Sequence, residues 1–306
     1  MRISSARPTA AALHAAVLAG LRWLEAGTRD PAWLTCDHLL CFRILQRNAR
    51  DKRLAARSAR SYRRLLSCYP IDRDALTGAE EPYDFIDSLC VAVLLEEQGA
   101  GPGTAAIRAA VLARPEEFFW TLTPRAHGYA NCVALINYYL FERLGIRMGH
   151  TLAELLSSCA PRALERSRER SEDELEPQLY FATHWVYALT QYGAIRLDRK
   201  QHVALHEFLQ RILPDAVDYG NVETLAEVIG CLKLFGHRDE ERSLSAAVRL
   251  LWKRQNPDGS WGSRRGRNRT HATCVALTAL AEYASEPVRP RSGCVATTPS
   301  LRVPDT

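Results

Sequence analysis

Hydrophobic residues recur along this chain with the spacing of α-helices, and almost no segment alternates in the manner of a β-strand. The helical stretches are of two kinds, which alternate along the sequence. One kind is charged on its outer face, and the other is apolar on nearly all sides. Each stretch ends at a glycine, a proline or a charged break, so we expect an all-α protein.

The apolar stretches begin about every 44 to 49 residues. They cover residues 34–49, 83–98, 129–144, 177–192, 221–235 and 268–284. The charged stretches cover residues 10–26, 52–68, 104–114, 151–170, 199–213 and 239–255. Four apolar stretches end at a glycine that suits a left-handed helix cap, namely Gly99, Gly145, Gly193 and Gly236. The pattern therefore predicts six helical hairpins.

A helical hairpin cannot bury its apolar face alone, so consecutive hairpins form either an open solenoid or a closed ring. A helix that is apolar on all sides must be surrounded by others. An open solenoid also needs polar capping repeats at both ends, and the sequence offers no such pair. We therefore predict a single (α/α)6 barrel over residues 1–285, with the apolar helices inside and the charged helices outside. Residues 286–306 are polar and contain prolines, which predicts a flexible tail.

The last hairpin carries a recognisable motif. Residues 247–262 read AVRLLWKRQNPDGSWG, and residues 270–280 read THATCVALTAL. This segment resembles the QW-type repeat of the α/α-toroid superfamily, which includes squalene and other class II terpene cyclases and the β-subunits of protein prenyltransferases. The resemblance implies a tight turn from Asn256 to Gly259, with Trp261 folded back onto the hairpin. It also implies an active site in the central cavity.

Two motifs of that superfamily are missing. Class II cyclases protonate their substrates with an Asp-x-Asp-Asp string, which does not occur in this sequence. Other members hold one zinc ion with Asp, Cys and His, and the spacing of those ligands has no match here. The resemblance therefore supports the fold more directly than it supports a reaction.

Composition narrows the classes of function. The net charge of +5 is spread over many arginines without a nucleic-acid reader motif, which argues against DNA or RNA as a partner but remains compatible with an anionic small substrate. The nine cysteines include no Cys-x-x-Cys pair, and several lie in apolar helices, as expected for a protein of the reducing cytoplasm. No secretory signal and no apolar run long enough to span a membrane is present.

Polar residues cluster near the beginning of every predicted inner helix, where the first turns of a closed ring converge on one mouth of a central cavity. The set comprises Asp37, His38, Asp84, Asp87, Asn131, Cys132, Thr183, His184, Glu223, Glu227, Thr270 and His271. His184 and Glu227 precede their closing glycines by the same interval, so we expect them at the same depth. Asp87 should lie one turn nearer the mouth.

Three explanations of this cluster stay open. The first is a divalent metal site, with zinc or iron bound by some of His184, His271, Glu227, His38 and Asp87. The second is acid–base catalysis or ligand binding without a metal, by Asp87, Glu227, His184 and His271. The third is structural, with the same groups serving as helix caps and buried hydrogen bonds. The outer histidines His202, His206 and His237 are predicted to be solvated.

The sequence thus favours an enzyme of specialised or isoprenoid-like metabolism that acts on a small organic substrate or a peptide in the central cavity. The alternative is a non-catalytic toroid that binds a peptide or protein partner on its rim. The reaction, the substrate and the oligomeric state stay open.

Overall fold

A computed structural model describes residues 8–29, 34–69, 82–99, 129–146, 172–263 and 267–284, together with six isolated positions at 105, 109, 112, 152, 154 and 156. Across these residues the regular secondary structure is α-helical, as predicted, apart from one isolated β-bridge. No helix in the described part of the chain is long and apolar enough to cross a membrane.

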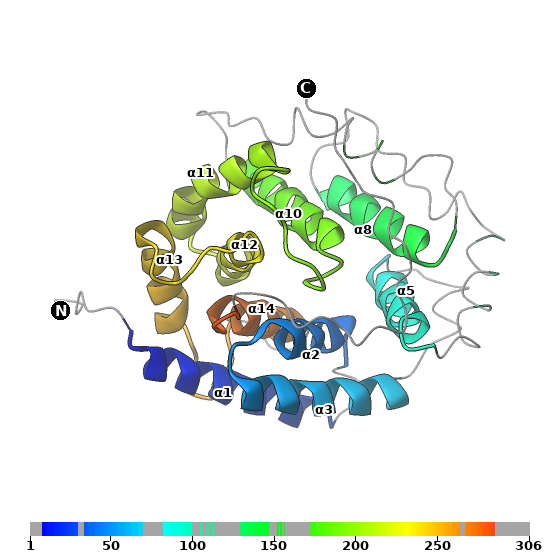
Figure 1. Cartoon of the computed structure of the whole chain (residues 1–306), viewed down its shortest axis with the longest axis horizontal. Coiled ribbons are helices and arrows are strands. Elements are labelled where there is room, and N and C mark those ends of the chain that lie inside the picture. The colour runs from blue at the N-terminus through cyan, green and yellow to red at the C-terminus, as the bar shows by residue number, and fades with distance from the viewer. Residues whose placement is uncertain are drawn as a thin grey trace.

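Six helices form the inner wall: α2 (Cys36–Asn48), α5 (Pro82–Glu96), α8 (Tyr129–Arg143), α10 (Glu172–Leu189), α12 (Val222–Leu234) and α14 (Arg267–Leu280). Each inner helix contacts the next along the chain, and α14 contacts α2, so the ring is closed (Figure 1). In α12 every residue from 224 to 234 is buried, as expected for a helix surrounded on all sides. The predicted α/α toroid is confirmed.

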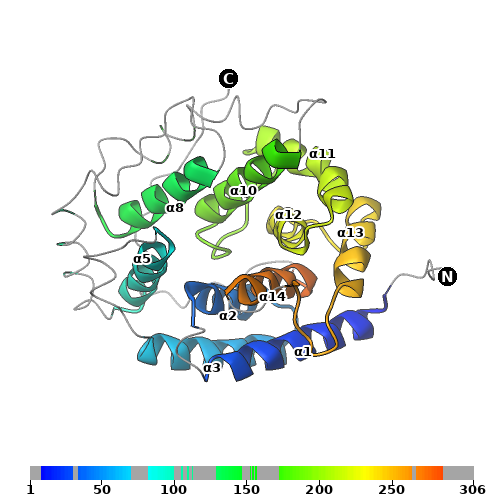
Figure 2. The ribbon, with the colours of Figure 1, turned by 180° about the vertical axis from the view of Figure 1, so that it is seen from behind.

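The outer wall contains α1 (Ala10–Gly27), α3 (Lys52–Cys68), α11 (Val203–Tyr219) and α13 (Arg242–Lys253). Figure 2 shows these helices outside the ring, with α1 and α3 along the α14 and α2 side. Two further outer helices were predicted at 104–114 and 151–170, and apart from the isolated positions they lie outside the described residues. The predicted tail at 286–306 lies outside them as well.

Two predicted boundaries were wrong, and a proline is the reason in both cases. The helix predicted to start at residue 177 starts at 172, with Pro177 inside it. The helix predicted over 199–213 spans 203–219 and continues through Pro214. A proline inside a helix removes one backbone hydrogen bond. At Pro214 the carbonyl that loses its partner belongs to Gln210, which is exposed and can be solvated instead.

The two ends of the described ring are joined by backbone hydrogen bonds. Ala49 forms an antiparallel bridge with Tyr283. On either side of it, Arg50 N donates to Glu282 O at 2.8 Å, and Ala284 N donates to Asn48 O at 2.8 Å. These bonds tie the segment after α2 to the segment after α14, so closure does not depend on side-chain packing alone.

The carboxyl ends of the inner helices lie at one rim of the barrel, where cationic side chains meet them. The four predicted cap glycines have positive φ angles of 73°, 69°, 77° and 82°. Arg43 Nη1 donates to Gln191 O at 2.7 Å, and its Nη2 atom pairs with Glu97 at 2.7 Å. Lys233 Nζ donates to Ala281 O at 3.0 Å. Cationic side chains are favourable at this rim because it carries the negative ends of the helix dipoles. The opposite rim holds the amino ends of the inner helices.

The turn in the last hairpin forms as the sequence predicted. Gly259 has a φ of 94°, and Gly259 N donates to Asn256 O at 2.9 Å. Trp261 is fully buried and donates from Nε1 to Leu251 O at 2.9 Å. Gly20 of α1 lies so close to this indole that a Cβ atom there would be 2.7 Å from Cζ3 of Trp261. The tryptophan therefore joins α13 and packs against α1.

Candidate active site

The ring encloses a cavity of about 1460 Å³, and all six inner helices contribute to its lining. This volume exceeds the range of about 300–1,000 Å³ that is usual for small-molecule pockets. Each inner helix contributes a polar or thiol side chain: Asp37, Asp87, Cys132, His184, Glu227 and His271. Further from the mouth the lining is mainly apolar and aromatic, with Ile44, Leu140, Val275, Tyr187 and Tyr192.

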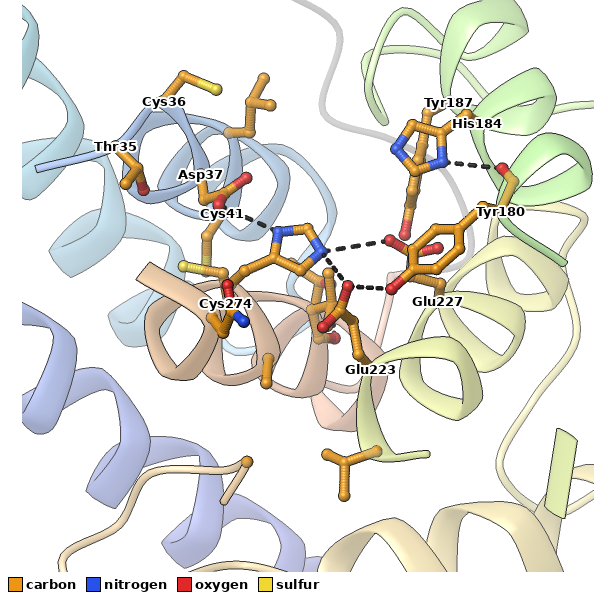
Figure 3. A pocket seen from close by; sticks show the side chains of 18 of the residues that line it. Thr35, Cys36, Asp37, Cys41, Tyr180, His184, Tyr187, Glu223, Glu227 and Cys274 are labelled. Carbon is orange, nitrogen blue, oxygen red and sulfur yellow. Dashed lines mark hydrogen bonds and ion pairs between the residues drawn. The ribbon is translucent and has the colours of Figure 1, made fainter. Parts of the chain in front are cut away.

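His271 lies at the mouth between three carboxylates. Its Nδ1 atom is 3.0 Å from Asp37 Oδ2, and its Nε2 atom is 3.3 Å from Glu223 Oε1 and 3.4 Å from Glu227 Oε1. Figure 3 labels the three carboxylates, which meet in the cavity from α2 and α12. The side chains of His271, Asp37 and Glu223 are 26%, 25% and 23% exposed, whereas that of Glu227 is 1% exposed. The cluster joins α2, α12 and α14 and can be reached from the cavity.

Attraction between opposite charges shifts the pKa values of His271, Asp37 and Glu227 toward their charged forms. Burial by itself lowers the pKa of His271, but the charges of Asp37 and Glu223 hold that pKa well above its ordinary value. Burial likewise raises the pKa of Asp37, and the imidazolium of His271 more than offsets it, so the pKa is lowered. For Glu227, burial is outweighed by the charges and hydrogen bonds of His184, His271 and Thr183, and its pKa is also lowered.

Glu223 differs from its neighbours. Burial raises its pKa, the attraction of His271 offsets part of that rise, and the charge of Glu227 adds to it, so the pKa of Glu223 lies above its ordinary value. Its Oε1 atom accepts a short hydrogen bond from the Tyr180 hydroxyl and also faces His271. A proton on Glu223 would therefore be held by Oε2. The pKa of one carboxyl of the cluster is thus raised, whereas the pKa values of the other two are lowered.

His184 approaches the same cluster from α10. Its Nδ1 atom donates to Tyr180 O at 2.8 Å, and its ring meets the edge of Tyr187 with centroids 5.6 Å apart. The preceding residue, Thr183, donates from Oγ1 to Glu227 Oε2 at 2.6 Å. His184 and Glu227 were expected at the same depth. The direct contact to Glu227 comes from Thr183, because adjacent helical residues point in directions about 100° apart.

Asp87 and His38 take other positions. Asp87 lines the cavity on the α5 side, and its Oδ1 atom accepts from Cys36 N at 3.4 Å. His38 is buried, and its Nδ1 atom lies 3.4 Å from both N and Oγ1 of Thr35 in a capping box at the start of α2. Burial lowers the pKa of His38. The structure thus brings His271, Glu227 and His184 together, leaves Asp87 on another wall, and places His38 outside the cavity lining.

The donors do not fit a metal ion. Both ring nitrogens of His271 face carboxylates at ion-pair distance, so neither has a lone pair directed at a common point. In the part of the chain that the structure describes, no group of three or more His, Cys, Asp or Glu side chains is arranged to hold a metal. The predicted zinc or iron at this mouth stays a prediction.

Sequence reasoning missed three members of the site. Asp37 and Glu223 were recognised as polar residues at the mouth but were not chosen as functional, and Tyr180 was not recognised. Glu223 precedes Glu227 by four residues, and Tyr180 precedes His184 by four. Side chains four residues apart on a helix share one face. That spacing was the signal that could have identified both residues.

The comparisons with known proteins fit this architecture. No curated protein matches the chain. Residues 157–294 match the family model described as squalene-hopene cyclase C-terminal domain. Together with the closed ring of helices, this match confirms the predicted resemblance to the α/α-toroid superfamily of terpene cyclases and prenyltransferases.

Proposed function

We propose that this protein is an enzyme that performs acid–base chemistry on an apolar, isoprenoid-like substrate held in the central cavity. The observation that carries the proposal is the position of His271 among Asp37, Glu223 and Glu227, at the mouth of a cavity with a mainly apolar interior. Strongly perturbed titratable groups in a cavity are typical of functional sites. The match to a squalene-hopene cyclase domain supports an isoprenoid as the substrate class.

Glu223 is the proposed proton donor. Its raised pKa keeps it protonated at a higher pH than an ordinary glutamate, and general acids work best when their pKa lies near the working pH. The acid would deliver the Oε2 proton to a double bond of the substrate, whose π electrons form the new C–H bond and leave a carbocation. In this scheme Glu223 does the work that the missing Asp-x-Asp-Asp string does in class II cyclases.

The ionised carboxylates of the cluster would stabilise the carbocation. Asp37 and Glu227 carry negative charge beside the mouth, and Tyr180 and Tyr187 of α10 also line the cavity. Carboxylates and aromatic faces both stabilise a cation in a cavity of low dielectric constant. Loss of a proton from the cation to the Glu223 carboxylate would form an alkene and restore the acid, so the reaction consumes no other reactant.

The apolar lining sets the shape of the substrate. Ile44, Leu140 and Val275 come from three different inner helices and offer no polar group to a ligand. A hydrocarbon chain can therefore extend from the acid at the mouth into the cavity. Burial of that chain contributes about 25 cal/mol for each Å² of apolar surface removed from water.

The test is an incubation of the purified protein with linear isoprenoids of increasing chain length, each as the alcohol and as the diphosphate, followed by gas chromatography and mass spectrometry. We expect an isomeric product of unchanged mass from one of the hydrocarbon-like substrates. Glu223→Gln should abolish the product, whereas Glu207→Gln, an exposed glutamate on α11, should not. Full activity in Glu223→Gln would refute the assignment of the acid, and no conversion of any substrate would refute the proposed reaction.

A further inference from the structure

Three of the nine histidines of the chain gather on the outer wall, away from the central cavity. His202 precedes α11, His206 lies in its first turn, and His237 lies in the connection from α12 to α13. The rings of His202 and His206 pack on Phe235 with centroids 6.5 and 5.1 Å away, and the His206 and His237 rings lie edge to edge with centroids 5.0 Å apart. These residues are predicted from the sequence to be solvated, and the fold instead buries His237, half-buries His202 and His206, and places the three together.

Two of these rings face each other through their Nε2 atoms. His206 Nε2 lies 2.7 Å from His237 Nε2. On the opposite side of its ring, His237 Nδ1 lies 2.5 Å from Glu241 Oε2. A carboxylate only accepts hydrogen bonds at neutral pH, so the His237 proton is on Nδ1 and its Nε2 lone pair points at His206. A histidine that donates one nitrogen to a carboxylate and offers the other is the usual second-sphere arrangement of a metal ligand.

We propose that His206 and His237 form a binding site for a divalent transition-metal ion on the outer wall, separate from the cavity. Imidazole nitrogens suit zinc, copper and nickel. At metal–nitrogen distances of about 2.0–2.1 Å, two ligands of a tetrahedral ion lie roughly 3.3 Å apart. The Nε2 atoms therefore have to separate by about 0.6 Å, and both rings have to turn, because each Nε2 now points at the other instead of at a shared ion. His206 is half-buried and can make that movement, while its Nε2 proton transfers to Nδ1.

The site supplies two protein ligands, and water completes the coordination. Among the described residues no third His, Cys, Asp or Glu converges on the pair. The ion would link α11 to the connection between α12 and α13, which are neighbours in Figure 1. Binding to the folded state alone stabilises it, so the metal should raise the melting temperature.

Isothermal titration calorimetry on the full chain without an affinity tag tests the proposal. Zinc and nickel chlorides should each bind with one high-affinity site per chain, and magnesium chloride should not bind, because magnesium prefers oxygen ligands. His206→Ala should remove this site and the zinc-dependent rise in melting temperature. Glu241→Gln should weaken zinc binding by about 10–100-fold, as second-sphere changes do. His14→Ala, a change of an exposed histidine on α1, is the matched control and should bind like the wild type.

Three results would overturn the proposal. The first is the absence of saturable zinc or nickel binding in the wild type. The second is equal binding in the wild type and in His206→Ala, which keeps its fold because the side chain is partly exposed. The third is binding that survives His206→Ala and disappears in His184→Ala or His271→Ala, which would move the metal to the cavity mouth.

Discussion

Replacing His271 with glutamine tests the electrostatics of the cavity mouth directly. The imidazolium lies 3.0, 3.3 and 3.4 Å from three carboxylate oxygens. At an effective dielectric constant of about 20, each such contact is worth about 5 kcal/mol before desolvation is subtracted. Removal of one member of a buried ion pair costs about 3–5 kcal/mol in measured cases. Three of the four side chains are about a quarter exposed. We therefore expect His271→Gln to lower the free energy of unfolding by about 3 kcal/mol, the low end of this range.

The stability lost in His271→Gln should depend on pH. The raised pKa of His271 contributes stability that is complete below the unfolded value of 6.5 and is lost as the pH rises through the higher folded value. The lowered pKa values of Asp37 and Glu227 contribute stability above their unfolded values of 3.8 and 4.5, which is lost at lower pH. The stability difference between wild type and His271→Gln should therefore be greatest between pH 4.5 and 6.5.

Urea denaturation followed by circular dichroism, at pH values from 3 to 10 in steps of about one unit, measures this difference. His14→Gln is the control, because the pair between His14 and Asp51 is 3.5 Å long and largely exposed and should contribute less than about 1 kcal/mol. A loss in His271→Gln as small as that of the control, or a loss that does not change with pH, would refute the charged cluster.

Other predictions test the packing and the proposed acid. Gly20→Ala should destabilise the protein by about 1–3 kcal/mol in thermal unfolding, because the new Cβ atom would lie 2.7 Å from the Trp261 ring; wild-type stability would contradict this packing. Lys233→Met should cost about 3–5 kcal/mol in urea denaturation, because it leaves Asp239 buried without its partner at 2.7 Å. Adding Asp239→Asn should recover most of that loss, and no recovery would argue against the pair. Tyr180→Phe removes a hydrogen bond that lowers the pKa of Glu223, the proposed acid. The alkaline limb of the pH profile of kcat/KM should therefore move to higher pH, and an unchanged limb would argue against Glu223 as the acid.

The architecture was accessible from sequence because it depends on patterns that repeat. Inner helices that are apolar on all sides can only be surrounded, and the cap glycines mark where four of them end. Both features follow from local composition. The helix boundaries near Pro177 and Pro214 were predicted wrongly, because the sequence does not reveal whether a helix can tolerate one missing hydrogen bond.

The site was harder to predict because its geometry depends on how each helix is rotated about its axis. One residue along a helix changes the side-chain direction by about 100°, which separates Asp37 in the cavity from His38 in the capping box. The pair formed by His206 and His237 depends on two elements that meet only in the folded chain. No spacing in the sequence brings those residues together.

The backbone bridge between Ala49 and Tyr283 has a consequence for how the protein is made. A ribosome adds about 5–20 residues per second, so these two partners emerge roughly 10 to 50 s apart. During that interval the growing chain exposes the apolar flank of α2 that α14 later covers. Nascent chains that stall before α14 is complete should therefore be the species that chaperones bind and proteases remove.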